Sequence, residues 1–192
     1  VTPPGAFVVC FFGAIGRQFD LDTVIEAARR LQRGTRKIFF VLCGSGDSLA
    51  SCRYSARDCR NMLFPGWVEA PDIWVLMRMS AVGLAPYRNS FEFSRSLPNK
   101  PIEYLSAGLP LLSSLQGVVG QMVMDHDCGV TYREGDADDL VSKLVFLHDH
   151  PDRLRAMSSN ALSLYKKRFT ASEVYGNMAA YLELVAKRGK QN

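Results

Sequence analysis

The chain has 192 residues, of which 47% are hydrophobic and 22% are charged, and its formal net charge is +4 at pH 7. This composition is typical of a folded globular protein and excludes a disordered chain. No apolar run approaches the roughly 20 residues that cross a bilayer, so a membrane-spanning chain is excluded as well. The basic residues are spread too thinly for nucleic-acid binding, which usually needs a dense basic stripe with aromatic residues among it.

Two short basic clusters, at residues 166–168 and 187–190, interrupt this even distribution. Their simplest interpretation is a solvated helix face, and a weak attraction to anionic lipid headgroups is the alternative. The chain begins with Val1 and shows no basic segment followed by an apolar one. No signal peptide is therefore visible in this sequence, and we expect it to be a piece of a longer protein.

The five cysteines form no CxxC pair, and Cys10, Cys43 and Cys128 lie in or beside apolar runs. We expect buried, reduced thiols, as in a cytosolic protein, rather than disulfides or zinc ligands.

Buried strands are predicted at five apolar runs: residues 6–12, 37–43, 81–86, 110–114 and 129–132. A short strand is expected near residues 64–68, and a helix opens at Pro71. Between the runs lie two helical stripes, one made of Val24, Ile25, Ala28 and Leu31 and the other of Leu140, Val141, Leu144 and Leu147. Near-continuous apolar strands that alternate with helices predict an α/β fold with a doubly wound parallel sheet.

The C-terminal part of the chain changes character and is predicted to be helical throughout. Thr170 and Glu173 form a T-x-x-E capping box at the start of the last helix. We therefore divide the chain into an α/β domain at residues 1–169 and a C-terminal helix at residues 170–192.

Ligands of a doubly wound sheet bind outside the carboxyl ends of the strands, next to helix N-termini. After the first strand lie Gly13, Gly16 and Arg17. The glycines would let the backbone approach a ligand, and the arginine could hold a phosphate with two N–H groups. The spacing does not match the dinucleotide fingerprint G-x-G-x-x-G, so a structural turn with a surface arginine is the competing interpretation.

Two further loops are equally ambiguous. Gly44 and Gly46 lie in a G-S-G-D turn after the second strand, and Trp67 and Val68 follow the short third strand. Trp67 either packs against the domain or lines a pocket for a base.

The segment SLPNKPIEYLSAG is the most informative part of the chain. It predicts a helix with Asn99 as N-cap, Pro101 in the first turn and Gly108 at the end. Lys100 is electrostatically unfavourable at this positive helix end unless an anion binds there. Glu103, about one turn later, could accept two hydrogen bonds from a ribose diol. The alternative is that Glu103 offsets the helix dipole and that the lysine is solvated.

A metal site is not expected. His148, Asp149 and His150 stand directly before Pro151, where histidines favour the C-terminus of a helix.

The chain resembles the C-terminal, nucleotide-sugar-binding half of family 4 retaining glycosyltransferases over nearly its whole length. Six segments carry the resemblance in order: GAIGRQFDLDTVIEAARRL, FVLCGSGD, MLFPGWVE, SAVGLAPYRNS, SLPNKPIEYLSAGLPLLSS and CGVTYREGDADDLVSKLVFL. The pattern SLPNK-x-x-EY-x-x-x-G-x-P is similar to that of the branch that builds bacterial surface polysaccharides. The resemblance implies one Rossmann-like half of the glycosyltransferase-B fold, in which this domain binds the donor and a missing N-terminal domain binds the acceptor.

By this resemblance, Glu103 holds the donor ribose, and Pro98, Asn99 and Lys100 lie near the diphosphate. Arg17 takes the place of a phosphate-binding basic residue, with the turn from residue 13 to residue 16 beside it. Arg17 and Lys100 are therefore the expected catalytic residues. The expected donor-binding residues are Gly13, Gly16, Gly44, Gly46, Trp67, Val68, Pro98, Asn99 and Glu103.

Residues 44–47 and 66–68 fall where the family encloses the base. The family's E-x7-E signature has a glutamate eight positions before Glu103, where this chain carries Arg95. This difference puts sugar contacts from that segment in doubt, although the SLPNK form is expected in this branch.

We therefore expect the donor-binding half of a glycosyltransferase that moves a sugar from a nucleotide diphosphate sugar, with UDP as the expected carrier, to a polysaccharide or lipid-linked acceptor. Lipopolysaccharide or capsule biosynthesis is the expected process. No metal or other cofactor is required, because helix N–H groups and two cations would stabilise the leaving diphosphate. The isolated chain is expected to be inactive.

The expected partners are the nucleotide sugar and the missing acceptor domain. The last helix would pack on that domain through Tyr175, Met178, Tyr181 and Leu182, which would then be partly exposed here. The expected location is the cytoplasm or the inner face of the cytoplasmic membrane.

Two other functions compete with this one. A nucleotide-sugar 2-epimerase has a similar architecture and would convert the donor without an acceptor. A domain that has lost its chemistry and serves only for binding or assembly is the other alternative, and Arg95 is its only support.

Overall fold

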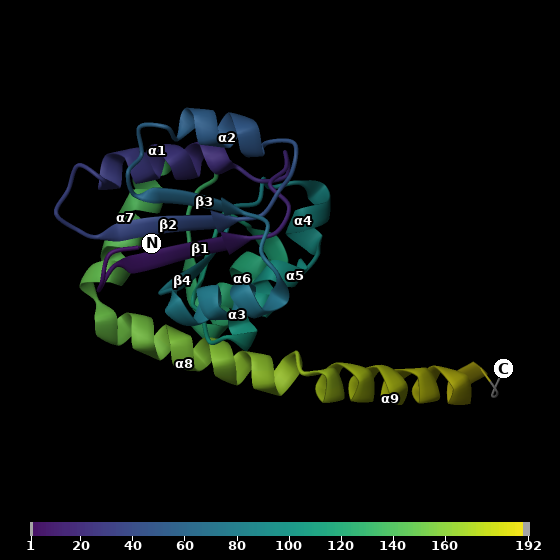
Figure 1. The fold of residues 1–192 in the computed structure, drawn as a ribbon. Coiled ribbons are helices and arrows are strands. Elements are labelled where there is room, and N and C mark those ends of the chain that lie inside the picture. Colours follow the sequence, from purple (N-terminus) through teal and green to yellow (C-terminus); the bar gives the residue numbers. More distant parts are fainter. Residues whose placement is uncertain (1, 190–192) are drawn as a thin grey trace.

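The structure, a computed structural model, describes residues 2–189. Its centre is a parallel sheet with the strand order β3-β2-β1-β4-β5-β6 (Figure 1). The strands are β1 Phe7–Phe12, β2 Ile38–Cys43, β3 Met62–Gly66, β4 Val82–Ala85, β5 Leu111–Ser113 and β6 Gly129–Thr131. Each predicted apolar run contains a strand, and β3 forms the expected short one, so the doubly wound parallel sheet is confirmed.

Helices cover both faces of the sheet. They are α1 Leu21–Leu31, α2 Leu49–Ser55, α3 Ala70–Met79, α4 Phe91–Arg95, α5 Asn99–Ser106, α6 Gly117–His126, α7 Ala137–Asp149, α8 Pro151–Arg168 and α9 Ala171–Gly189. Figure 1 shows α1 and α2 above the sheet and α3, α5 and α6 below it. Parallel connections are right-handed, so the helices change face where the strand order reverses. This reversal lies between β1 and β4, and it is where a doubly wound sheet opens a crevice for ligands.

The predicted helical stripes are the ones that enter the core. Val24, Ile25, Ala28 and Leu31 of α1 are all buried. In α7, Leu140, Leu144 and Leu147 are buried and Val141 is half-buried. The five cysteines are buried and unpaired, as predicted.

Tyr104 fixes α5 to the centre of the sheet. Its side chain is fully buried, and its hydroxyl donates to the carbonyl oxygens of Leu84, at 3.0 Å, and Cys10, at 3.4 Å. The ring lies against the backbone of Gly83 in β4, where a Cβ atom would be 2.2 Å from the ring. A glycine in this strand is therefore required for α5 to lie close to β1 and β4.

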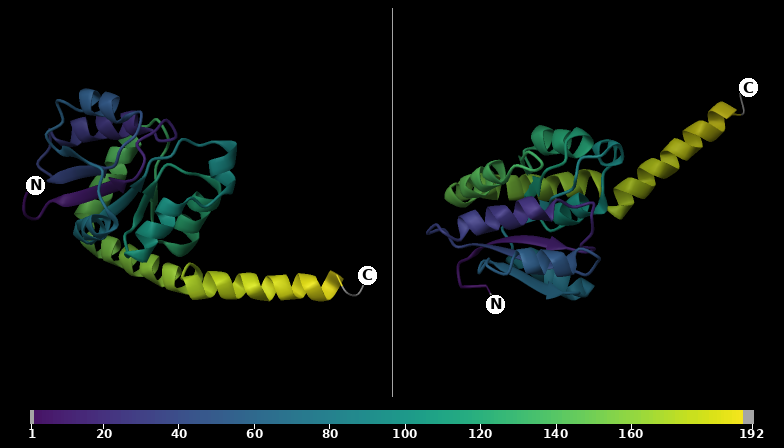
Figure 2. Two further views of the ribbon diagram at one scale, coloured as in Figure 1. Left: turned by 45° about the vertical axis from the view of Figure 1, so that its right-hand side comes forward. Right: turned by 90° about the horizontal axis from the view of Figure 1, so that it is seen from above.

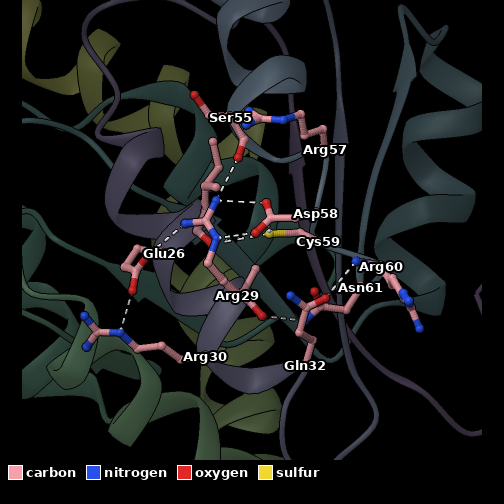
Figure 3. Close-up of polar contacts among 12 residues, drawn as sticks. Glu26, Arg29, Arg30, Gln32, Ser55, Arg57, Asp58, Cys59, Arg60 and Asn61 are labelled. Atoms are coloured by element: carbon pink, nitrogen blue, oxygen red, sulfur yellow. Dashed lines mark hydrogen bonds and ion pairs between the residues drawn. The ribbon is translucent and has the colours of Figure 1, made fainter.

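A cluster of ion pairs joins α1 to the loop before β3 (Figure 3). The Arg29 guanidinium contacts both oxygens of Asp58, at 2.7 and 3.0 Å, and its Nη1 atom contacts Glu26 at 2.7 Å. Arg29 lowers the pKa of the Asp58 carboxyl to about 2. Because the cluster is solvent-exposed, we expect it to contribute little to the free energy of unfolding.

The C-terminal helices differ in their surroundings. Helix α8 contacts α5 and α7, whereas α9 projects away from the domain (Figures 1 and 2). The capping box is half confirmed, because the Glu173 N–H donates to Thr170 Oγ1 at 3.3 Å and no return bond is found within residues 2–189. Lys187 and Arg188 are exposed, while the rest of the predicted basic face and of the helix, residues 190–192, lies outside the described residues, as does Val1.

None of the helices in the described part of the chain is long and apolar enough to cross a bilayer.

We predict that Gly83→Ala lowers the free energy of unfolding by about 1 to 3 kcal/mol, because the new methyl group overlaps the Tyr104 ring. Urea unfolding monitored by circular dichroism measures the effect. Gly176→Ala is the matched control, since no atom lies within 4 Å of its Cβ position in α9. An unchanged unfolding midpoint for the Gly83 variant would contradict the packing described for Tyr104.

Candidate functional site

Backbone hydrogen bonds join three loops at the carboxyl edge of the sheet. The N–H of Gly13 donates to Cys43 O at 3.0 Å, and the N–H of Gly44 donates to Gly66 O at 2.6 Å. A Cβ atom on Gly44, whose φ is +142°, would lie 1.8 Å from Gly13 O. Only glycine allows this approach, so the loops after β1, β2 and β3 form one continuous surface.

The second glycine of the G-S-G-D turn has the same role. A Cβ atom on Gly46 would lie 2.4 Å from Ile15 O, and the N–H of Ile15 donates to Ser45 O at 2.8 Å. The close contact of loops therefore explains both glycines, and their predicted contact with the donor stays a prediction.

Lys100 lies directly above this surface. Its Nζ atom is 2.7 Å from the position that a Cβ on Gly13 would occupy. The same atom lies 5.1 Å from the ring centroid of Phe11 and 5.2 Å from that of Phe19. Burial lowers the pKa of the Lys100 ammonium, and the nearby Glu103 carboxylate acts in the opposite direction. The structure thus places a partly desolvated positive charge over a glycine loop.

Helix α5 begins one residue earlier than predicted, so the assignment of Asn99 as N-cap is wrong. Pro98 is the N-cap residue, with φ −63° and ψ 160°, and α5 has no side-chain cap. Pro101 contributes to this difference, because it removes one of the two N–H groups, at N2 and N3, that a capping side chain at position 99 could bond. The first N–H groups of α5 are therefore left without a side-chain acceptor, next to the Lys100 ammonium.

Glu103 lies on the exposed side of α5. Its carboxylate makes no hydrogen bond or ion pair with any of residues 2–189. Burial, and to a smaller extent the negative charge of Glu103, raise the pKa of the Tyr87 phenol to about 12. An exposed carboxylate close to an ammonium can accept hydrogen bonds from a ligand that the ammonium also contacts.

Three further predicted site residues, Arg17, Trp67 and Val68, lie outside the contacts of Lys100 described above. Arg17 is exposed beside Gly16, and the structure does not bring it into contact with Lys100. Trp67 has 66% of its surface exposed, and its indole N–H donates to Glu69 Oε1 at 3.0 Å. This exposure does not favour the interpretation that Trp67 packs against the domain, and its predicted contact with a base stays a prediction. Val68, next to it, is half-buried.

A polar network that joins the start of α1 to the segment after β4 was not predicted. Buried Asp20 caps α1 and accepts from the N–H of Gly135 at 3.0 Å. Arg88 lies 3.6 Å from Asp20 and 3.9 Å from Glu134, and Asn89 donates to Ser114 O at 2.9 Å. The run of polar residues directly after β4 was the signal that could have revealed this network, because it stands at the carboxyl end of a buried strand.

Arg95 replaces the first signature glutamate and is turned onto its own helix. Its guanidinium carbon lies 4.0 Å from the ring centroid of Phe91 in α4. Nothing in this contact supplies the carboxylate that the family pattern has at this position.

The histidine cluster binds its own neighbours, as expected for a helix end. His148 Nδ1 contacts Asp149 Oδ1 at 2.8 Å, and His150 Nδ1 contacts Phe146 O at 2.8 Å. Across residues 2–189, no three histidine, cysteine or carboxylate side chains are placed to hold a metal ion. The expectation that no metal is required stays a prediction.

A cavity of about 900 Å³ lies between α6 and the end of α8. Its lining includes Leu97, Met122, Leu164 and Phe169. It does not include Lys100 or the glycine loops, so we place the candidate site at the carboxyl edge on chemical grounds.

Comparison with protein families defines the class of this domain. Residues 2–163 match the model of the glycosyl transferases group 1 family. The chain belongs to this family, and the six-stranded parallel sheet described above has the Rossmann-like arrangement. No curated protein sequence matches the chain.

Solved structures show which proteins share this fold. Sucrose-phosphate synthase from Thermosynechococcus elongatus superposes with a TM-score of 0.80 at 17% identity, over 96% of this chain and 47% of that one. Anabaena HepE, in complex with UDP and glucose, gives 0.76 at 17% identity, over 93% and 48%. WaaG, a glycosyltransferase involved in lipopolysaccharide biosynthesis, gives 0.71 at 17% identity, over 89% and 45%. The chain therefore spans about half the length of these glycosyltransferase-B relatives.

We predict that the affinity for UDP, used here as a diphosphate probe, falls as pH rises through the lowered pKa of the Lys100 ammonium. The ammonium is charged below that pKa, and only the charged form attracts a diphosphate, so its contribution disappears above it. Calorimetric titration at several pH values measures this dependence.

The matched control is Lys100→Arg, whose guanidinium stays charged and which corrects for titration of the nucleotide itself. If the ratio of the wild-type affinity to the affinity of this variant did not change with pH, Lys100 would not be the cation that binds the nucleotide.

Proposed function

We propose that this chain is the donor-binding half of a retaining glycosyltransferase of family 4 that uses a UDP-sugar. The acceptor is a growing polysaccharide or a lipid-linked saccharide of the bacterial surface, as in lipopolysaccharide or capsule biosynthesis. One observation carries the proposal: the Lys100 ammonium lies over Gly13, next to the uncapped start of α5, at the point where the strand order reverses.

This arrangement suits a leaving diphosphate. During transfer, the bond between the anomeric carbon and the phosphate oxygen breaks, the acceptor hydroxyl oxygen bonds to that carbon, and the hydroxyl proton passes to the departing diphosphate. Negative charge then grows on the diphosphate, where a fixed ammonium and helix N–H groups stabilise it more than they stabilise the intact donor. Arg17, at the exposed rim of the glycine loop, would supply the second cation after its side chain turns toward the diphosphate.

The remaining donor contacts follow from the position of the diphosphate. Glu103 would accept hydrogen bonds from the ribose hydroxyls, since its carboxylate has no partner in the described chain. The base would lie along the joined loops after β2 and β3, where the exposed Trp67 ring is available for stacking. UDP is the proposed carrier because the HepE relative was solved with UDP and glucose.

The missing half of the protein would supply the acceptor site. Helix α9 supports this, because it exposes an apolar stripe that the rest of the described chain does not cover: Val174, Tyr175, Met178, Tyr181, Leu182 and Val185. A stripe of this width is typical of a helix that packs on another structural unit. We propose that the acceptor domain covers it. The chain alone would then bind the donor without transferring the sugar.

A cytoplasmic location, in solution or at the inner membrane face, is part of the proposal. Its support is the five unpaired cysteines, which suit a reducing compartment.

We predict that Glu103→Gln weakens UDP binding by about tenfold, because hydrogen bonds to a charged acceptor contribute more than those to a neutral one. The ligand control is a UDP analogue without the 2′ and 3′ hydroxyls, whose affinity the substitution should not change. Calorimetric titration of the 192-residue chain with both ligands measures the difference. Equal UDP affinity of the wild type and the variant would refute the ribose assignment, whereas absence of UDP binding by the wild type would count against the proposed function itself.

A further inference from the structure

Helix α3 has an outer face that no other part of the described chain covers. Trp74 is 50% exposed, Val75 is 54% exposed and Met79 is 64% exposed. Arg78, also exposed, follows Trp74 by four residues, and Met79 follows Val75 by four, so the four side chains form two adjacent rows on one face. We call this set the α3 surface.

The stability of the fold does not require these side chains. The opposite side of α3 attaches it to the domain, through buried Met77 and half-buried Ile73 and Leu76. Large apolar groups on the outer face of a helix that is already fixed to its sheet indicate a surface that meets something other than water.

One positive charge, Arg78, lies on the α3 surface itself, and two more lie at the same edge of the sheet. Lys37 and Arg60 precede β2 and β3, and Arg78 lies in the last turn of α3, so all three are at the amino edge of the sheet. None of the three is in an ion pair within the described residues. Figure 3 shows the Arg60 side chain extending away from the ion-pair cluster of α1. The acidic residues of α3 lie at its other end, where Glu69 and Asp72 form a capping box.

We propose that the α3 surface docks on an anionic lipid bilayer. A tryptophan and aliphatic side chains that enter the headgroup region, together with arginine and lysine that contact lipid phosphates, are the combination by which helices bind such a surface. The site is distinct from the basic residues Lys166, Lys167 and Arg168 in the last turn of α8 and from Lys187 and Arg188 in the last turn of α9.

A second copy of the chain fits this surface less well. Two identical α3 surfaces related by a twofold axis would bring Arg78 close to its own copy, with no carboxylate on the surface to offset the two charges. A plane of anionic lipid offers the opposite charge.

The geometry is compatible with sugar transfer but does not depend on it. Helix α3 covers a face of the sheet, whereas the glycine loops and Lys100 are at its carboxyl edge. Docking through α3 would therefore place the sheet parallel to the membrane and leave its carboxyl edge accessible to solvent.

The two tryptophans of the chain allow a direct test, because one lies on the α3 surface and the other beside the glycine loops. Trp67→Phe leaves Trp74 as the only reporter, and Trp74→Phe leaves Trp67. Each single-tryptophan protein is mixed with vesicles of phosphatidylcholine alone or with equal parts of phosphatidylglycerol. We expect the emission of Trp74 to shift to shorter wavelength and to be quenched by brominated lipid, only with the anionic vesicles. The emission of Trp67 is expected to stay unchanged.

Matched substitutions locate the contact by vesicle co-sedimentation. Arg78→Gln should lower the partition coefficient by about fivefold, whereas Arg168→Gln in α8 should not. Met79→Ser should also lower it, whereas Met178→Ser, which changes an exposed methionine of α9, should not.

Three results would overturn the proposal: equal binding to both kinds of vesicle or to neither, a stronger effect of the Met178 or Arg168 variant, or self-association through α3 without lipid. UDP titration of the same variants tests the donor site separately. Absence of lipid binding would therefore not count against the proposed function.

Discussion

The close approach of three glycine-containing loops is the constraint on which the candidate site depends. Because Gly44 has no side chain, the loop after β2 can lie directly on the carbonyl group of Gly13. The loop after β1 is thereby kept close to the carboxyl edge of the sheet, and the Lys100 side chain can extend across it. Any larger residue at position 13 would displace the ammonium, because its Cβ atom would lie 2.7 Å from Lys100 Nζ.

This position is unfavourable for the protein without a ligand. The ammonium loses part of its hydration among Phe11 and Phe19, and it stands near the positive end of α5. The anchoring of α5 through Tyr104 keeps it there, because the hydroxyl is bonded to the backbone of both β1 and β4. A strongly anionic ligand would offset both costs at once, which is why these residues are better explained by a diphosphate than by packing.

The sequence predicted the features that repeat along the chain. The strands were found because their apolar runs are nearly continuous, and α1 because its buried side chains recur at helical spacing. The assignment of Asn99 as N-cap was wrong by one residue, and Pro101 weakens such a cap because it lacks one of the two N–H groups that the asparagine could bond. The position of the Lys100 ammonium next to the rings of Phe11 and Phe19 was not predicted. Phe11 is part of an apolar strand and Phe19 is part of a loop, so neither position indicates a contact with a distant lysine. The contact of Asp20 with Gly135 joins residues 115 positions apart and has no local pattern.

The most direct measurement is a crystal structure of this chain with bound UDP. We expect the diphosphate within hydrogen-bonding distance of the Lys100 ammonium and the first N–H groups of α5, with the ribose hydroxyls on the Glu103 carboxylate. A nucleotide bound elsewhere, for example in the cavity between α6 and α8, or one at the carboxyl edge that does not touch Lys100, would contradict the proposed role of Lys100.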